Sequence, residues 1–544
     1  MTREARLRLA LSVALVAAAA ALYLPFAGNP LVFDDRIFFS GRRFAYYAAH
    51  PLGFDLRLPA YFSLSATQAI WGSLLAHRLV SLALHAAVGL LLFRFLFDLQ
   101  RAAAPAGARE REQTLYAAIG AAAFVLHPVA VYGAGYLVQR TIVLATLFSL
   151  AAALLFLRGL RRRGYGDALS AAGCYWLAVL SKEHAVLLPA ALLPLLVVAG
   201  TERRFALRYA ALFLAACAPA GLFAVLHSLH LIGGAYEAGA PAIAAQIESH
   251  APSDALEPSL ALSAVTQAGL FFRYLALWFW PDPGAMSIDV RIDFAAGWTP
   301  IWIAVKLASF VACAAAAAVL VTRRGSPGMA GFGLLYAWIL FLVYFSAVLL
   351  QEPFVLYRAY LFGPGVASVA VAGLSRLPMR AAVVVGLAAL AGLALGAHGR
   401  LTTFSDPLRL WEDAAAKLPD QPIPWGSRTL YGLGREYLYA HRPDDALATA
   451  ERCVRLYPKT AQCIYARGAV RLQRHEFGLA AGDLRRAIAL EPGAGIIYHR
   501  LGLAQECEGR LDDAKASYRE AQSRGYGGAS FELRRLEGPA PKPP

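Results

Sequence analysis

Charge is scarce in this sequence. Of its 544 residues 16% are Asp, Glu, Lys or Arg, whereas 58% are hydrophobic, and the mean hydropathy is +0.50. A soluble domain carries about 25% charged residues. The shortage excludes an ordinary soluble enzyme, a disordered chain and a collagen-like chain. It indicates a protein that crosses a membrane several times, since an apolar run of about 20 residues spans a bilayer.

Cysteine and the common catalytic motifs are also scarce. The chain has 6 cysteines and no Cys-x-x-Cys pair, so it shows no zinc site and no disulfide framework. We find no glycine-rich phosphate loop, no Gly-x-Ser-x-Gly and no His-Glu-x-x-His. ATP-driven transport and hydrolase chemistry are therefore unsupported, and we expect no cofactor and no metal.

The net charge of +15 follows the membrane topology and does not indicate nucleic acid as a partner. Basic clusters lie between apolar runs, where the positive-inside rule places them in the cytoplasm. We interpret the first run, behind Arg3, Arg6 and Arg8, as a retained helix and not a cleaved signal peptide. The segment 264–280 is expected to be re-entrant or interfacial. About eleven spans remain, and everything after 398 then lies outside the cytoplasm. The predicted spans are 9–27, 74–97, 115–128, 141–158, 167–181, 185–200, 208–229, 299–322, 330–350, 357–375 and 381–397.

A repeat of 34 residues follows the last apolar run, as in positions 434, 468 and 502. Glycine occupies these three positions, alanine occupies 446, 480 and 514, and proline occupies 458 and 492. Small residues let two antiparallel helices approach closely, and proline ends the second helix. The pattern predicts three tetratricopeptide repeats. Such repeats form a concave surface that typically binds peptide or protein, although a rigid packing module is the alternative.

The sequence therefore predicts an all-α protein with a polytopic membrane domain and a C-terminal repeat solenoid. We place the membrane domain at 1–400, a connecting or capping helix at 401–426, and the repeats with an end helix at 427–537. The repeat units are 427–460, 461–494 and 495–528, and a disordered tail is expected at 538–544.

Ionisable residues gather in the loops predicted to face away from the cytoplasm. Asp34 and Asp35 follow the first span, and an aspartate held at a membrane boundary can accept a proton from a hydroxyl. One of the two would act and the other orient it; alternatively, the pair holds the helix end in place. Arg140, Lys182 and Arg358 end apolar runs on this face and suit a phosphate, or they anchor the interface.

Two further residues support this set. His127, before Pro128, is suited to bonding a phosphate or sugar oxygen, or to capping a turn. Glu183 is expected to pair with Lys182 or Arg140. The aromatic residues around Trp278 fit an interfacial belt or a groove for a polyisoprenoid lipid.

The order of these motifs resembles the transmembrane-and-tetratricopeptide-repeat O-mannosyltransferases and their bacterial relatives, within the GT-C glycosyltransferase class. The similarity covers Val32–Arg36, Arg78–His85, His127-Pro128, Leu180–Glu183, Arg273–Leu275 and Arg358–Leu361, with the repeats after the last span. Two departures concern the sugar and the acceptor: Ala130 and Tyr132 stand where the family often has a histidine and a glutamate.

The resemblance implies an inverting, GT-C-like hexosyltransferase that uses a polyprenyl-phosphate-linked sugar. Asp34 or Asp35 would be the base, and Lys182 and Arg358, with Arg140, would hold the donor phosphate. The repeats would recruit a protein acceptor through Ser or Thr, and they would lie in the periplasm beside a bacterial inner membrane. Two alternatives stay open: a glycan or lipid acceptor, and a non-catalytic membrane scaffold for envelope assembly.

Overall fold

The computed structural model describes residues 2–40, 43–50, 55–104, 109–234, 260–294 and 298–538. These residues form helices, with no β-strand among them, which confirms the all-α class. The chain divides into two compact units, Met1–Val290 with Phe294–Pro407, and Arg291–Asp293 with Leu408–Pro544. The predicted domain boundary after residue 400 is close to this division. The predicted tail lies, apart from Gly538, outside the described residues.

Eight helical segments in the described part of the chain are long and apolar enough to cross a membrane, or nine if one bent pair is a single span. They differ in how much of their apolar stretch is covered: 67% for the segment ending at Arg162 but 11% for Pro300–Val321, so the first lies inside the bundle. The segments are α1 (Arg3–Tyr23) with η1 (Leu24–Phe26), α5 (Leu74–Ala103), η2 (Leu137–Gln139) with α8 (Arg140–Arg162), α12 (Arg203–His227), α14 (Leu260–Phe279), α15 (Pro300–Val321), α16 (Ser326–Phe341) with η6 (Leu342–Phe345), and α18 (Met379–Thr403). The bent pair is α6 (Glu110–Val125) and α7 (Pro128–Ala134).

The expectation of about eleven spans exceeds this number because three predicted spans are short or broken helices. They are α9 (Tyr165–Ser181), α17 (Ala359–Leu374), and the run η3 (Glu183–Leu187), α10 (Leu188–Leu192) and α11 (Pro194–Val198). Proline interrupts the last run because its ring cannot continue a preceding helix. The segment expected to be re-entrant is α14, which is also long enough to span.

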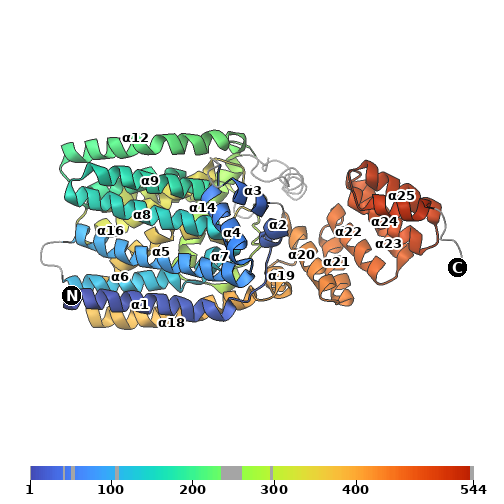
Figure 1. Ribbon diagram of the computed structural model, residues 1–544, viewed down its shortest axis with the longest axis horizontal. Helices are drawn as coiled ribbons and strands as arrows, with labels where there is room; N and C mark the ends of the chain where they lie inside the picture. The colour runs from blue at the N-terminus through green and yellow to red at the C-terminus, as the bar shows by residue number, and fades with distance from the viewer. Residues whose placement is uncertain are drawn as a thin grey trace. The chain divides into compact units, whose positions relative to one another are not determined.

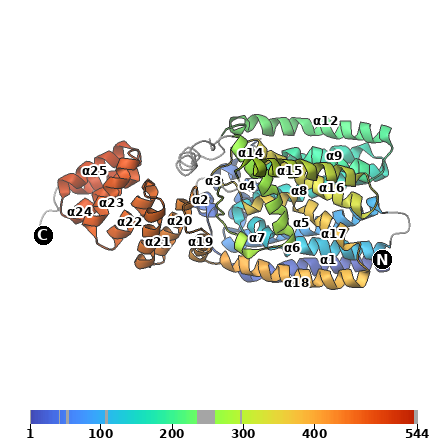
Figure 2. The ribbon, with the colours of Figure 1, turned by 180° about the vertical axis from the view of Figure 1, so that it is seen from behind.

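Short helices collect at one end of the membrane unit. In Figures 1 and 2 the long helices run side by side, and α2 (Asp34–Ser40), α3 (Arg43–Ala49) and α4 (Leu58–Trp71) lie at the end away from the N-terminus. The C-terminal end of α18 is at this end too, since the Asn29 amide donates a 3.1 Å hydrogen bond to the Leu401 carbonyl. The polar loops after α1, α7, α9 and α12 therefore share one end of the bundle.

The second unit consists of helix pairs with the predicted period. The pairs are α20 (Gly426–Tyr439) with α21 (Pro443–Leu456), α22 (Ala461–Gln473) with α23 (Phe477–Leu490), and α24 (Gly495–Cys507) with α25 (Leu511–Ser523). Ala446, Ala480 and Ala514 are fully buried, so small residues do allow close approach. The turn residues His441, His475 and Gly509 are also 34 residues apart (441, 475, 509), and all have positive φ. The 34-residue period therefore also applies to the left-handed backbone conformation of these turns, which the sequence pattern did not reveal.

Helices cover both ends of the repeat stack, as predicted. α19 (Pro407–Ala416) places the Trp411 ring directly against Gly432 of α20, where an added methyl group would overlap the ring. At the other end, α26 (Ala529–Glu537) packs Ala529 and Leu533 into the cluster around Tyr518. Both caps remove apolar surface that a terminal repeat would otherwise expose to water.

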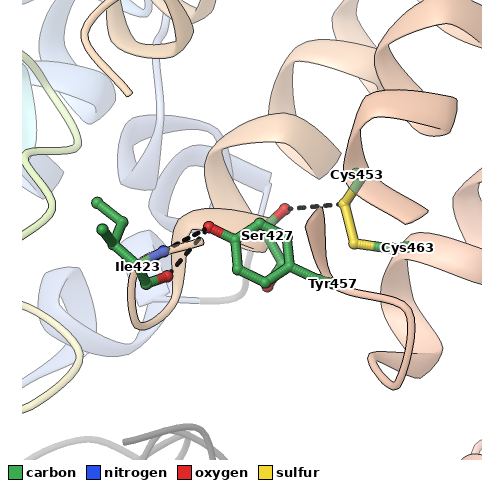
Figure 3. The surroundings of a disulfide bond; sticks show 5 residues. All are labelled: Ile423, Ser427, Cys453, Tyr457 and Cys463. Atoms are coloured by element: carbon green, nitrogen blue, oxygen red, sulfur yellow. Dashed lines mark hydrogen bonds between the residues drawn. A yellow bond between two sulfur atoms is a disulfide. The ribbon is translucent and has the colours of Figure 1, made fainter. Parts of the chain in front are cut away.

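A disulfide joins the first two repeats. Cys453 of α21 bonds to Cys463 of α22, and the bridge lies beside the Ser427 carbonyl, 3.7 Å from the Cys453 sulfur (Figure 3). Tyr457 lies next to the bridge and fastens the loop before α20, because its hydroxyl donates to the Ile423 carbonyl at 3.0 Å and accepts from the Ile423 amide at 3.1 Å. The spacing of the two cysteines had left their pairing open.

Equivalent repeat glycines differ in the space around them, which gives a matched test of the packing. A methyl group at Gly434 would lie 3.9 Å from its nearest neighbour, whereas one at Gly502 would lie 2.6 Å from a carbon of the Tyr518 ring. We expect Gly434→Ala to stabilise the repeats by up to about 1 kcal/mol, because alanine favours the helix. Gly502→Ala should destabilise them by about 1–3 kcal/mol through overpacking.

The measurement is the temperature dependence of proteolysis in the repeat unit of the full-length protein. Equal shifts for the two variants would contradict the packing described here.

Candidate functional site

Asp35 is a buried carboxylate that fastens the start of α2 to the loop before α8. Its side chain accepts hydrogen bonds from the amides of Val138 at 2.8 Å and Leu137 at 3.4 Å. Burial raises the pKa of Asp35 to about 6, against the lowering effects of Arg78 and of these amides. Asp35 has no exposed surface, and its carboxylate is bonded to the backbone before α8.

Asp34 has the opposite surroundings. It is exposed, and its backbone amide donates a 2.9 Å hydrogen bond to the Tyr136 hydroxyl. The residue before it, Phe33, has a φ of 50°, a left-handed conformation that is costly for a side chain of this size. This turn lets two adjacent carboxylates face different surroundings, so the structure distinguishes two residues that the sequence treated alike.

Glu183 pairs with Arg57, and not with Lys182 or Arg140 as predicted. The Arg57 guanidinium donates to both carboxylate oxygens, at 3.1 and 2.5 Å. Burial opposes the charge on Glu183, but Arg57 and Lys182 outweigh it and hold the pKa of Glu183 well below its usual range. Sequence reasoning missed Arg57. The sequence feature that could have identified Arg57 is its position in the first outer loop, where a cation could neutralise a glutamate of another outer loop.

No carboxylate of the described residues contacts the Lys182 ammonium directly. Its side chain is buried, and within the described part of the chain its ammonium makes no hydrogen bond or ion pair; it lies 5.5 Å from the centre of the Tyr357 ring. Burial, together with the cations Arg57 and Arg358, lowers the pKa of Lys182 to about 7, whereas Glu183 and Asp34 act to raise it. Asp34 is therefore within electrostatic reach of this ammonium.

Arg358 is a buried cation within electrostatic reach of Lys182. It comes from η7 (Leu356–Arg358), donates a 2.8 Å hydrogen bond to the Glu352 carbonyl, and stacks over Tyr344 at 5.2 Å. A guanidinium bound to a carbonyl and a ring keeps its full positive charge.

Two cavities lie at this end and share Glu183, Ser228 and Leu231, whereas Asp34 and Lys182 line neither of them. One, of about 570 Å³, is polar and aromatic, and the other, of about 220 Å³, is mainly apolar with charged groups at one end. The polar cavity is lined by Tyr46, Tyr47, Asp55, Leu56, Arg57, Tyr61, His227 and His230 besides the shared residues. The apolar cavity is lined by His184, Val186, Leu187, Ala224, Val225, Ile232, Leu342, Val343, Tyr344, Ser346, Ala347, Leu349 and Arg358.

Arg140 and His127 bond to protein groups instead of lining either cavity. All three guanidinium nitrogens of Arg140 donate to groups of α4 and α5, including Thr67 at 3.1 Å and the His77 carbonyl at 2.9 Å. His127 accepts from the Val129 amide and contacts the Trp278 carbonyl, each at 3.1 Å, so it caps α7. The turn-capping alternative describes His127, whereas Arg140 is buried and joins α8 to α4 and α5, a role that the sequence analysis did not include.

The described residues contain no cluster of metal ligands. In that part of the chain no three or more His, Cys, Asp or Glu side chains converge in a way that could hold a metal ion. The charged and polar groups of the site are cations, the carboxylates of Asp34, Asp55 and Glu183, and tyrosine, histidine and serine side chains.

Comparison with known proteins gives matches among solved structures, which include tetratricopeptide-repeat proteins. No protein-family model and no curated protein matches the sequence. Among the matching solved structures, MamA is 26% identical and covers 24% of this chain and 80% of its own, with a TM-score of 0.20. The first repeat domain of Spaghetti (RPAP3), bound to an HSP90 peptide, is 22% identical over 20% of this chain and 90% of its own, with a TM-score of 0.20. YrrB, described as a tetratricopeptide-repeat protein with an unusual peptide-binding site, is 14% identical over 30% and 84%, with a TM-score of 0.22. The assignment of the repeats accordingly depends on the helix pairs of this chain.

Proposed function

We propose that this protein is an inverting glycosyltransferase that moves a monosaccharide from a polyprenyl-phosphate donor to an acceptor hydroxyl. The observation that supports it most directly is the buried Lys182 ammonium. It has no ion pair among the described residues, and Arg358 and the exposed Asp34 are within electrostatic reach of it. A phosphate would supply an anion to Lys182, and the Arg358 guanidinium would offer it further hydrogen-bond donors. An exposed carboxylate nearby would supply a base.

The two cavities fit the two halves of such a donor. The apolar cavity, with Arg358 at its charged end, suits an isoprenoid chain next to its phosphate. The polar cavity, with tyrosine, histidine and aspartate side chains, suits a sugar and its hydroxyl acceptor, which need hydrogen bonds and aromatic faces.

The reaction would need no ATP, since the bond between sugar and phosphate stores the driving force. Asp34 takes the proton of the acceptor hydroxyl as its oxygen attacks the anomeric carbon. The bond from that carbon to the phosphate oxygen breaks, the phosphate leaves with both bonding electrons, and Lys182 and Arg358 stabilise its charge. Attack opposite to the leaving phosphate inverts the configuration.

The repeats are proposed to recruit a protein acceptor on the side of the membrane opposite the cytoplasm. Two observations support that side: α18 ends at the same end of the bundle as the loop after α1, and the repeats contain a disulfide. Disulfides persist mainly in oxidising compartments outside the cytoplasm. The proposed membrane is the bacterial inner membrane, with the repeats in the periplasm.

Replacing the two aspartates separately tests the base. Asp34→Asn should lower transfer about 10²–10⁴-fold at matched expression, because it removes the base. Asp35→Asn should lower the thermal midpoint, because it alters a buried acceptor of two backbone hydrogen bonds.

The readout is mass spectrometry of periplasmic proteins and envelope glycans from a strain lacking the chain, complemented with wild type or either variant at matched expression. A sugar mass that wild type restores to a protein, and Asp34→Asn does not, supports the proposal. Loss from a glycan alone would identify a glycan acceptor. Full restoration by Asp34→Asn would contradict the enzymatic role and leave a scaffold.

The charge of Lys182 predicts a pH dependence of lipid binding. Lysine is charged below its pKa, here about 7, so its attraction for phosphate should be present at pH 6 and weaken as the pH rises to 9. We expect the Kd of a short polyprenyl phosphate to rise about tenfold more for wild type than for Lys182→Arg, since arginine stays charged.

Both proteins experience the same titration of the lipid phosphate, so the ratio of their Kd values isolates the lysine. A ratio that stays constant from pH 6 to pH 9 would remove Lys182 from the phosphate site.

The compartment of the repeats can be read from the cysteines. Of the 6 cysteines, two are paired, so alkylation of denatured, unreduced protein taken directly from cells should label four, and reduction should expose all 6. Labelling of all 6 without reduction would place the repeats in a reducing compartment and contradict the proposed topology.

A further inference from the structure

Three arginines surround one phenylalanine at the N-terminal end of the membrane unit, far along α5 from the cavities. The guanidinium carbons of Arg8, Arg94 and Arg101 lie 5.1, 5.9 and 5.6 Å from the centre of the Phe97 ring. The ring itself is 2% exposed. Each distance is within the range of a cation–π contact, about 6 Å.

Carboxylates neutralise this cluster only in part. Arg8 pairs with Glu110, and Asp98 is shared between Arg94 at 2.7 Å and Arg161 at 3.3 Å. Within the described residues Arg101 has no acidic partner. Four cations (Arg8, Arg94, Arg101, Arg161) and two acids (Asp98, Glu110) leave a net charge of +2 (4 − 2).

Like charges gathered around one ring repel each other, and a bound anion would relieve that repulsion. Arg94 and Arg101 are exposed, so an anion can reach them from outside the bundle. This end of the bundle carries the N-terminus and the basic loops, which the positive-inside rule places at the cytoplasmic leaflet.

The same side of α5 continues as an apolar stripe. Counting back from Arg94 by helical turns gives Leu90, Ala87, Ala83 and Leu79, of which Ala83 and Leu79 are exposed and the other two are half-buried. A free phosphate has no apolar part that could pack on this stripe. A phospholipid would contact both the arginines and the apolar stripe, with its phosphate on the arginines and an acyl chain along α5.

We propose that Arg8, Arg94 and Arg101 around Phe97 form a binding site for one anionic phospholipid of the leaflet at the N-terminal end. The site is independent of the proposed transferase activity, because no residue of either cavity contributes to it. Its phosphate replaces the missing acidic partner of Arg101, and its tail covers the stripe on α5.

Native mass spectrometry of the purified full-length chain, titrated with phosphatidylglycerol, tests the site. We expect one retained lipid, bound about fivefold more weakly by Arg101→Gln and about 25-fold more weakly by Arg94→Gln/Arg101→Gln, since each cation near lipid phosphate contributes about 1 kcal/mol. Without lipid, the thermal midpoint of Arg101→Gln should equal or exceed that of wild type, because the substitution removes repulsion.

Arg109→Gln is the matched control. It removes the same charge from the following loop, where the Arg109 side chain is 81% exposed beside Glu112. Equal weakening by Arg109→Gln, or equal binding of phosphatidylcholine to wild type, would overturn the proposal. Inorganic phosphate that displaces phosphatidylglycerol at equal concentration would also overturn it, by showing an anion site that makes no use of the lipid tail.

Discussion

Charged groups at the end of an apolar helix bundle are stable only when opposite charges or water compensate them. At the end of this bundle that contains the cavities, the Arg57–Glu183 ion pair provides such compensation. Arg57 neutralises the carboxylate of Glu183, the residue that follows Lys182 in the sequence. No carboxylate of the described residues then contacts the Lys182 ammonium, and Arg358 lies at the charged end of the apolar cavity. Glu183 also lines both cavities, and Arg57 lines the polar one, so this contact links the charge of the site to the boundary between the two cavities.

Periodic parts of the fold could be predicted from the sequence. The glycine and alanine positions in the repeats recur with a fixed interval, and an interval of 34 residues translates directly into helix pairs, their partners and both caps. The membrane spans were less predictable because hydropathy reports composition and not helix continuity. Pro189 and Pro194 break an apolar run into three short helices, and hydropathy alone does not register that break.

The candidate site shows a different limit. Its residues were found by residue type and predicted side of the membrane, but their partners come from distant parts of the chain. Arg57 and Glu183 are 126 residues apart, and Asp35 bonds to amides more than a hundred residues away. The difference between Asp34 and Asp35 arises from the backbone turn at Phe33, which no composition or spacing rule specifies.

The bridge between Cys453 and Cys463 has a consequence for how the repeats open. In a stack of repeats each unit is stabilised mainly by its neighbours, so a stack commonly frays from an end. A covalent link between α21 and α22 makes the first two repeats a single cooperative block. The third repeat, with α24 and α25, has no such link and is held by packing and by its cap. Local opening should therefore begin at the C-terminal repeat, which makes the solenoid a rigid base with one adjustable end.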